Sequence, residues 1–184
     1  MSISETDLEH SNGADNGANR HGHGWYGVRV RSRFEQVSSA SLRSKGYQEF
    51  VPLVRSRRRW SDRVKDVHMP LFPGYVFCSF NPLRTLPVLQ SPGVVGIISF
   101  DGRPAAIPEE EIQAVRAMVD STLAVCPHPF LKSGQKIRVN RGPLAGVEGL
   151  IVEIKKTFRL VASIGLLQRS IAVEIDRDWV DPIS

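Results

Sequence analysis

The residues of this sequence that are best suited to chemistry are basic. Six positive side chains and one tryptophan fall between Arg55 and Lys65. They are Arg55, Arg57, Arg58, Arg59, Trp60, Arg63 and Lys65. Arginine and lysine neutralise phosphates and release counterions, which gives affinity for nucleic acid without sequence specificity. A tryptophan can stack on an unpaired base. We therefore expect nucleic-acid contact here; the alternative is a solvated loop whose charge only aids solubility.

Side chains for covalent or metal chemistry do not form a recognisable site. The sequence has no Ser/His/Asp order, no Cys-x-x-Cys pair, no P-loop and no dinucleotide fingerprint. The acids Glu109–Glu111 suit the first turn of a helix, and His68 stands alone. His21 and His23 lack a third metal ligand. We expect no catalysis, no metal and no cofactor.

Composition indicates a soluble, globular chain. It has 184 residues, of which 41% are hydrophobic and 23% charged, enough for one large or two small domains. A net charge of +5 favours an acidic partner, usually nucleic acid. Cys78 and Cys126 suggest no disulfide framework, and we expect both to be buried. Without an apolar run of ~18 residues or a visible signal peptide, a cytoplasmic protein away from membranes is expected.

Residues 1–24 are polar and predict a disordered tail, whereas residues 25–120 predict a first domain. The domain is expected to open with a strand at Trp25–Arg31, a helix with Phe34, Val37, Ser41 and Leu42 inward and Gly46 as its cap, and a strand at Tyr47–Val54. A long hairpin with the basic residues at its tip follows, and then strands at Tyr75–Phe80 and Val94–Phe100 with a short helix at Pro87 between them. After a turn at Asp101–Gly102, a helix from Pro108 is expected to face inward with Ile112, Val115, Met118 and Val119. We expect Tyr26, Val28 and Val30 on the buried face of the first strand and Trp25, Arg29 and Arg31 on the other. The order implies an α+β domain with an antiparallel sheet.

The uncharged stretch Met69–Phe80 is the centre of this domain. Val76, Cys78 and Phe80 are expected to be core residues of a buried strand. Phe72, Pro73 and Tyr75 lie at the bend before that strand, where we expect them to be exposed. An exposed aromatic cluster beside a rigid strand is typical of a docking surface.

Residues 121–133 contain two prolines and predict an extended linker to a second domain at 134–184. The expected strands of that domain are Gln135–Val139, Val147–Ile154, Phe158–Ile164, Ser170–Ile175 and Asp178–Val180. Five short strands without a helix favour a small closed barrel, because closure removes exposed edges.

Four motifs in order resemble the NusG family of bacterial transcription elongation factors. They are Trp25-Tyr26, Phe72-Pro-Gly-Tyr-Val-Phe77, Ser91-Pro-Gly-Val-Val95 and Pro104-Ala-Ala-Ile-Pro-Glu109. Gly134–Ile154 is similar to a KOW motif. The resemblance implies an α/β sandwich NGN domain followed by a five-stranded SH3-like KOW barrel. Arg59-Trp-Ser-Asp-Arg63 upstream of Pro70-Leu-Phe72 further resembles UpxY-like antiterminators of polysaccharide operons.

The resemblance also implies a function. The NGN domain would bind the clamp helices of the β′ subunit of RNA polymerase, with the β gate loop as a second contact, and would suppress pausing or termination and raise processivity. The matching positions are Trp25, Arg29, Phe72, Pro73, Tyr75 and Phe77. The basic hairpin would meet upstream or non-template DNA. The alternatives are a housekeeping elongation and termination factor, or a ribosome-associated KOW protein that binds RNA.

The turn Ile164–Arg169 departs from the housekeeping pattern. Housekeeping members carry an aromatic residue there, which binds ribosomal protein S ten or the termination factor Rho. This turn has none, which argues against Rho and leaves ribosomal protein S ten as a candidate. Leu166, Leu167 and Arg169 are either an altered docking patch or, for the two leucines, barrel core. Many β-branched residues argue against the helical refolding known in the RfaH branch. A monomer is expected.

Overall fold

The computed structural model describes residues 23–59, 64–128, 134–154 and 157–183. Most of the predicted tail, including His21, lies outside these residues. Trp60 and Arg63 of the basic stretch lie outside them as well.

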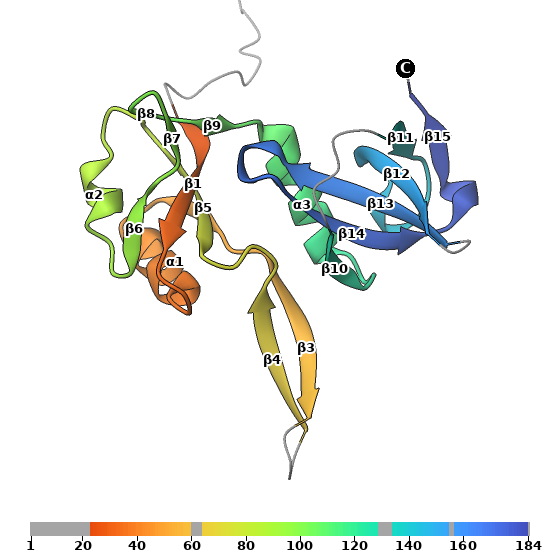
Figure 1. Cartoon of the computed structure of the whole chain (residues 1–184), viewed down its shortest axis with the longest axis horizontal. Coiled ribbons are helices and arrows are strands. Elements are labelled where there is room, and N and C mark those ends of the chain that lie inside the picture. The colour runs from red at the N-terminus through yellow and green to blue at the C-terminus, as the bar shows by residue number, and fades with distance from the viewer. Residues whose placement is uncertain (1–22, 60–63, 129–133, 155–156, 184) are drawn as a thin grey trace, which may run out of the picture.

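Two antiparallel sheets lie on either side of helix α3 (Glu109–Asp120), as Figure 1 shows. The N-terminal sheet has the order β2 (Gln48–Phe50), β5 (Tyr75–Phe80), β1 (Gly24–Val30), β6 (Val94–Ile97), and β9 (Ala106–Ile107) also pairs with β1. The C-terminal sheet has the order β10 (Val125–His128), β14 (Arg169–Ile175), β13 (Thr157–Ile164), β12 (Glu148–Ile154), β11 (Gln135–Val139), β15 (Val180–Pro182). The fold is therefore mixed α/β, with few helices and many strands.

Both faces of the N-terminal sheet are covered. On one face, Val76, Cys78 and Phe80 pack with Leu42 of α1 (Glu35–Ser44) and Val88 of α2 (Leu86–Leu89), which confirms them as core residues. Burial raises the pKa of the Cys78 thiol to about 12, with a smaller contribution from the charge of Glu49.

The other face of the same sheet packs with α3. Its core includes Trp25 and Phe77 of the sheet and Ile112, Val115 and Met118 of the helix. The prediction that Trp25 lies on the outer face of a half-buried strand is wrong about burial, because α3 adds a second layer and leaves Trp25 only 6% exposed. The predicted apolar stripe of α3 is confirmed for its three main members.

Helix α1 buries a more polar face than its apolar residues predict. Gly46 follows the helix with a φ of +84°, as a C-terminal cap requires. The inward residues include Ser38 and Ser39, because the Ser38 hydroxyl donates to the Pro92 carbonyl and the Ser39 hydroxyl donates to Glu49. Phe34 and Val37, expected inside, are 38% and 50% exposed.

Strands β3 (Leu53–Arg59) and β4 (Val64–Pro70) form a separate two-stranded ribbon that projects away from both sheets (Figure 1). The predicted hairpin is confirmed, but its basic residues are not confined to the tip. Arg55–Arg59 and Lys65 belong to the paired strands, with Arg58 opposite Lys65 and Arg57 opposite Asp66. Strand pairing therefore extends further than expected, through the charged residues as far as the pair Arg59 and Val64.

The N-terminal half departs from its predicted strands in one further place. The strand expected at 94–100 is divided into β6 and β7 (Ser99–Phe100) at Ile98, whose N–H donates to the Gly27 carbonyl. β7 then turns through Asp101–Gly102, both at positive φ, into β8 (Arg103–Pro104).

The predicted linker is partly a strand. β10 pairs with β14 along Val125–His128, and proline is tolerated there because β10 is an edge strand. Cys126 is exposed on this edge, so its predicted burial is wrong. The last strand, β15, begins at Val180 and not at the expected Asp178, because the preceding residues form the short 3-10 helix η3 (Arg177–Trp179). The described pairing gives six strands in a linear order, with β10 and β15 as its ends.

Two further short turns interrupt the C-terminal sheet, η1 (Gly142–Leu144) and η2 (Gly165–Leu167). Among the residues that the structure describes, no helix combines the length and the apolar character needed to cross a bilayer.

Candidate docking surface

The bend between β4 and β5 is held by hydrogen bonds of its backbone groups. Gly74 has a φ of +82°, which favours glycine. Its N–H donates to Oε1 of Glu35 at 2.9 Å, and its carbonyl accepts from the N–H of Val30 at 2.9 Å. The N–H of Tyr75 donates to the Phe72 carbonyl at 3.1 Å. These bonds present Pro73 and Tyr75 from a defined backbone.

The aromatic residues of the bend divide into two groups. Phe72 is 1% exposed and meets Phe77 edge-on, with ring centroids 5.5 Å apart, so the prediction that Phe72 is exposed is wrong. The Phe72 ring is buried because it belongs to the apolar cluster that also contains Phe77 and residues of α3, and burial of apolar surface is favourable. Pro73 is exposed and Tyr75 is half-buried. Arg29, directly opposite Tyr75 in the β1–β5 register, is exposed.

Arg116 of α3 joins the aromatic cluster, which no sequence signal indicated. Its guanidinium lies 5.4 Å from the ring centroid of Trp25 and 4.9 Å from that of Phe50. A cation over aromatic faces is attracted by the ring quadrupole. Arg116 thereby ties α3 to the face of the N-terminal sheet that carries Trp25.

The residue that begins β14 contacts the bend, and the η2 turn lies beside β1. The Arg169 guanidinium lies 5.2 Å from the Tyr75 ring centroid, and its Nη1 donates to the Pro73 carbonyl at 3.3 Å. Cδ2 of Leu167 lies 3.7 Å from the position that a Cβ on Gly27 would take. Leu166 and Leu167 are half-buried against the core shared with α3. The structure thus brings the predicted C-terminal partner residues onto the predicted polymerase residues.

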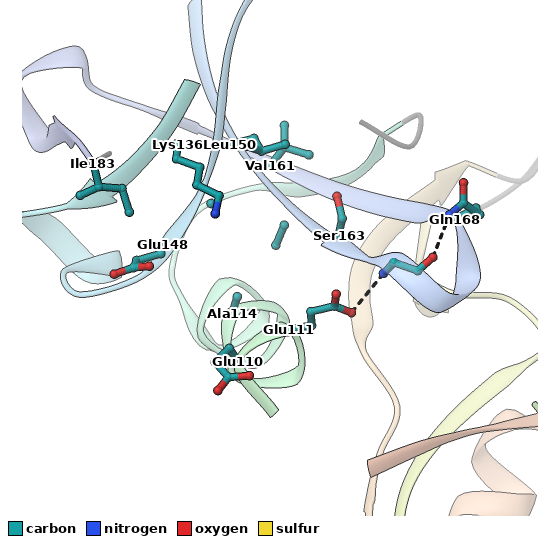
Figure 2. A pocket seen from close by; sticks show the side chains of 13 residues that line it. Glu110, Glu111, Ala114, Lys136, Glu148, Leu150, Val161, Ser163, Gln168 and Ile183 are labelled. Carbon is teal, nitrogen blue, oxygen red and sulfur yellow. Dashed lines mark hydrogen bonds between the residues drawn. The ribbon is translucent and has the colours of Figure 1, made fainter. Parts of the chain in front are cut away.

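A partly buried hydrogen bond joins α3 to the same turn. Oε2 of Glu111 accepts from the N–H of Gly165 at 3.0 Å, as Figure 2 shows. Burial raises the pKa of the Glu111 carboxyl; the Gly165 hydrogen bond opposes this and the nearby Glu110 charge adds to it. Sequence reasoning assigned Glu111 only to helix-start electrostatics. Nothing in a first-turn glutamate indicates a partner 54 residues later.

A cleft of about 520 Å³ opens beside this hydrogen bond, between α3 and the C-terminal sheet (Figure 2). Its walls are mainly apolar, with Leu150, Val161 and Ala114 among them. Within the described ranges, no group of three His, Cys, Asp or Glu side chains could hold a metal ion.

The Glu111 carboxyl should make stability depend on pH. Because its pKa is raised in the folded protein, its contribution is fully present below its unfolded pKa and is lost as pH rises through the folded value. We expect Glu111→Gln to be more stable than the wild type at pH 7, with the difference shrinking towards pH 4. Urea unfolding across this range measures it, with the exposed Glu109→Gln as control. A pH-independent difference would contradict the assignment.

Comparison with known proteins identifies the family. A family model described as "Transcription termination factor nusG" matches residues 23–116, just over half of the chain. The chain therefore belongs to the NusG family. The transcription termination/antitermination protein NusG of Salmonella typhi is 29% identical over 178 residues, covering 85% of this chain and 94% of that protein. The protein of the same name from Vibrio cholerae is 28% identical over 183 residues, covering 86% of this chain and 95% of that one.

A solved structure shows the same fold. The structure titled "Domain interaction in Thermotoga maritima NusG" superposes with a TM-score of 0.51 at 22% identity, and the match covers 88% of this chain and 98% of that one. Membership of the family makes this chain a NusG-type transcription termination/antitermination factor and not an enzyme.

Proposed function

We propose that this protein is a transcription elongation and antitermination factor that binds RNA polymerase through the bend of its N-terminal sheet. The observation that carries the proposal is the hydrogen-bonded bend that presents Pro73 and Tyr75, inside the segment that the family model matches. These two residues and Arg29 contact the clamp helices of the β′ subunit. Trp25, Phe72 and Phe77 form the apolar wall beneath them.

The proposed mechanism is a shift in polymerase conformation. A factor that bridges the β′ clamp helices and the β gate loop binds the closed clamp more tightly than the open clamp. Binding therefore favours the closed state by the difference between the two affinities. A closed clamp pauses and terminates less often, which raises processivity.

The β3–β4 ribbon is proposed to contact upstream or non-template DNA. Its projection from both sheets and its basic strands support this role (Figure 1). Each lost phosphate contact should lower the slope of log affinity against log salt by ~0.7 on single strands. For Arg57→Gln, Arg58→Gln and Arg59→Gln together we expect a slope smaller by about 2, measured by fluorescence anisotropy on labelled single-stranded DNA.

The control for the ribbon carries the same charge change elsewhere. Arg84, Arg103 and Arg138 are exposed outside the ribbon, and their triple replacement by glutamine should leave the slope almost unchanged. Equal slopes for the two triple variants would assign the affinity to overall charge and remove the role of the ribbon.

The C-terminal sheet is proposed to act as the partner-binding KOW module of the SH3-like barrel type, with β10 as part of it and residues 25–120 as the NGN domain. Leu166, Leu167 and Arg169 are its docking residues, and ribosomal protein S ten is the candidate partner. Rho is not expected to bind, because Ile164–Arg169 contains no aromatic residue.

The basic ribbon and the altered turn together favour a cytoplasmic, UpxY-like specialist over a housekeeping factor, with a polysaccharide operon as its target. In single-round transcription assays, a specialist should shorten pauses only on its own operon template. Shortened pauses on every template would identify a housekeeping factor.

The net positive charge and the C-terminal sheet support a second candidate, a ribosome-associated protein that binds RNA. Titration of the whole protein with core RNA polymerase and, separately, with RNA distinguishes the two. We expect saturable binding to polymerase. Salt-dependent binding to RNA without polymerase affinity would replace the elongation-factor proposal with the second candidate.

A further inference from the structure

We propose that the cleft between α3 and the C-terminal sheet binds a small organic cation, namely a primary ammonium group carried on an apolar body. This site lies apart from the polymerase and DNA surfaces proposed above and does not depend on either of them. Three features of the cleft carry the inference: its volume, its apolar walls and the excess of carboxylates among its polar side chains.

The cleft has the size and composition of a small-molecule site. Its volume is about 520 Å³, and ligand clefts commonly span roughly 300–1,000 Å³. Ala114 of α3 and Leu150 and Val161 of the C-terminal sheet give it apolar walls. In such clefts the apolar surface buries most of the ligand, and a few polar side chains fix its orientation. The walls would therefore cover the apolar body of the ligand.

Glu111 supplies the carboxylate nearest to the apolar walls. It lies in the first turn of α3, on the side that faces the η2 turn (Figure 2). Its Oε2 accepts the Gly165 N–H at 3.0 Å, and its Oε1 remains available to accept from a ligand. A Cβ on Gly165 would lie 3.2 Å from that Oε1, so glycine at this position lets the carboxylate lie close to the turn.

The charge of the lining favours a cation. Its charged side chains are three carboxylates and one ammonium, those of Glu110, Glu111, Glu148 and Lys136. Arg138 pairs with Glu148 through its Nε at 2.9 Å, which leaves two carboxylates against one ammonium. Burial raises the pKa of the Glu111 carboxyl, so its present neighbours stabilise the charged form incompletely. A ligand ammonium beside Glu111 would supply the missing stabilisation.

The Lys136 side chain shows that the cleft admits this chemistry. It is an ammonium on an aliphatic stem, and Figure 2 shows it reaching from β11 towards α3. Among the residues that the structure describes, its ammonium has no ion-pair partner. Because Lys136 is exposed and its four-carbon stem is flexible, it can move aside when a ligand cation binds beside Glu111.

The test is a titration of the isotope-labelled full-length protein, followed by the amide chemical shifts in NMR spectra. The three probes share one apolar body and differ in charge: cyclohexylmethylamine, cyclohexylmethanol and cyclohexanecarboxylate. We expect saturable shifts at the amides of Ala114 and Gly165. The amine should bind about tenfold more tightly than the alcohol, because hydrogen bonds between charged groups are stronger than neutral ones. The carboxylate probe should bind most weakly.

Two variants separate the charge from the cavity. Glu111→Gln keeps an acceptor for the Gly165 N–H but removes the charge, and it should bind the amine about fivefold more weakly. The matched control is Glu109→Gln, which makes the same change on α3 outside the lining of this cleft and should bind like the wild type. Ala114→Leu places a larger side chain in the cleft and should abolish the binding of all three probes.

The outcomes decide between three readings of the cleft. The expected order of the probes, together with a loss confined to Glu111→Gln and Ala114→Leu, supports the cation site. Equal affinities for amine and alcohol, tighter binding of the carboxylate probe, or equal losses in Glu109→Gln and Glu111→Gln would overturn the selection of a cation by Glu111. If no probe gives saturable shifts at Ala114 and Gly165, the cleft is not a site for this class of ligand. None of these results alters the polymerase proposal.

Discussion

Replacement of Tyr75 by alanine is expected to weaken the binding of core RNA polymerase by about thirtyfold, or about 2 kcal/mol. Tyr75 begins β5 on a backbone fixed by the Gly74 hydrogen bonds, so its ring is presented at little entropic cost. Tyr75 is the aromatic residue of the proposed contact, and binding energy in protein interfaces concentrates in residues of this type. A titration of fluorescently labelled protein with core polymerase measures the change.

Tyr47→Ala is the matched control, since Tyr47 is half-buried and packs with the opposite face of the sheet. Equal losses in Tyr47→Ala and Tyr75→Ala would mean that polymerase does not bind at the bend.

Replacement of Phe77 by alanine is expected to lower the free energy of unfolding by about 3–5 kcal/mol. Phe77 is fully buried and packs between the rings of Phe72 and Phe50, at centroid distances of 5.5 and 6.2 Å. Its removal leaves a cavity beneath α3 that neighbours on two sheets and a helix cannot all fill. Urea unfolding followed by circular dichroism measures the loss.

The control for Phe77 is Phe100→Ala, because Phe100 is 81% exposed on β7. We expect that variant to change stability by no more than about 0.5 kcal/mol. A loss below about 1 kcal/mol for Phe77→Ala would contradict the continuous core described for this face. A large loss also means that Phe77 supports the polymerase surface through folding, so Tyr75 is the sharper probe of contact.

The alternation of apolar residues predicted much of the fold. Strand β5 shows why: Val76, Cys78 and Phe80 fall on one face and Phe77 on the other, and period-two patterning depends only on local chain geometry. The buried face of helix α1 could not be predicted in the same way. Serines at 38 and 39 are buried because they bond to Pro92 and Glu49, and such distant partners leave no local trace.

The sequence also did not predict that β10 pairs with β14 as an edge strand. Pro127 indicates an extended segment, and the same extended geometry suits either a linker or an edge strand. Only the pairing of β10 with β14, across more than forty residues, decides between them.

The candidate site was predictable in its residues but not in its arrangement. The motif around Tyr75 marked the bend, and the turn near Arg169 was marked by its missing aromatic residue. Their contact with each other depends on how the C-terminal sheet packs against α3. Arg116 and Glu111 are likewise polar residues of an amphipathic helix in the sequence, and their roles come from rings and amides supplied by other elements.

Hydrogen exchange of the full-length protein, alone and saturated with core RNA polymerase, tests the central claim most directly. We expect residues 72–77 of the bend to gain protection on polymerase, because polymerase covers Pro73 and Tyr75. If residues 72–77 exchange equally fast with and without polymerase, polymerase does not bind at this bend.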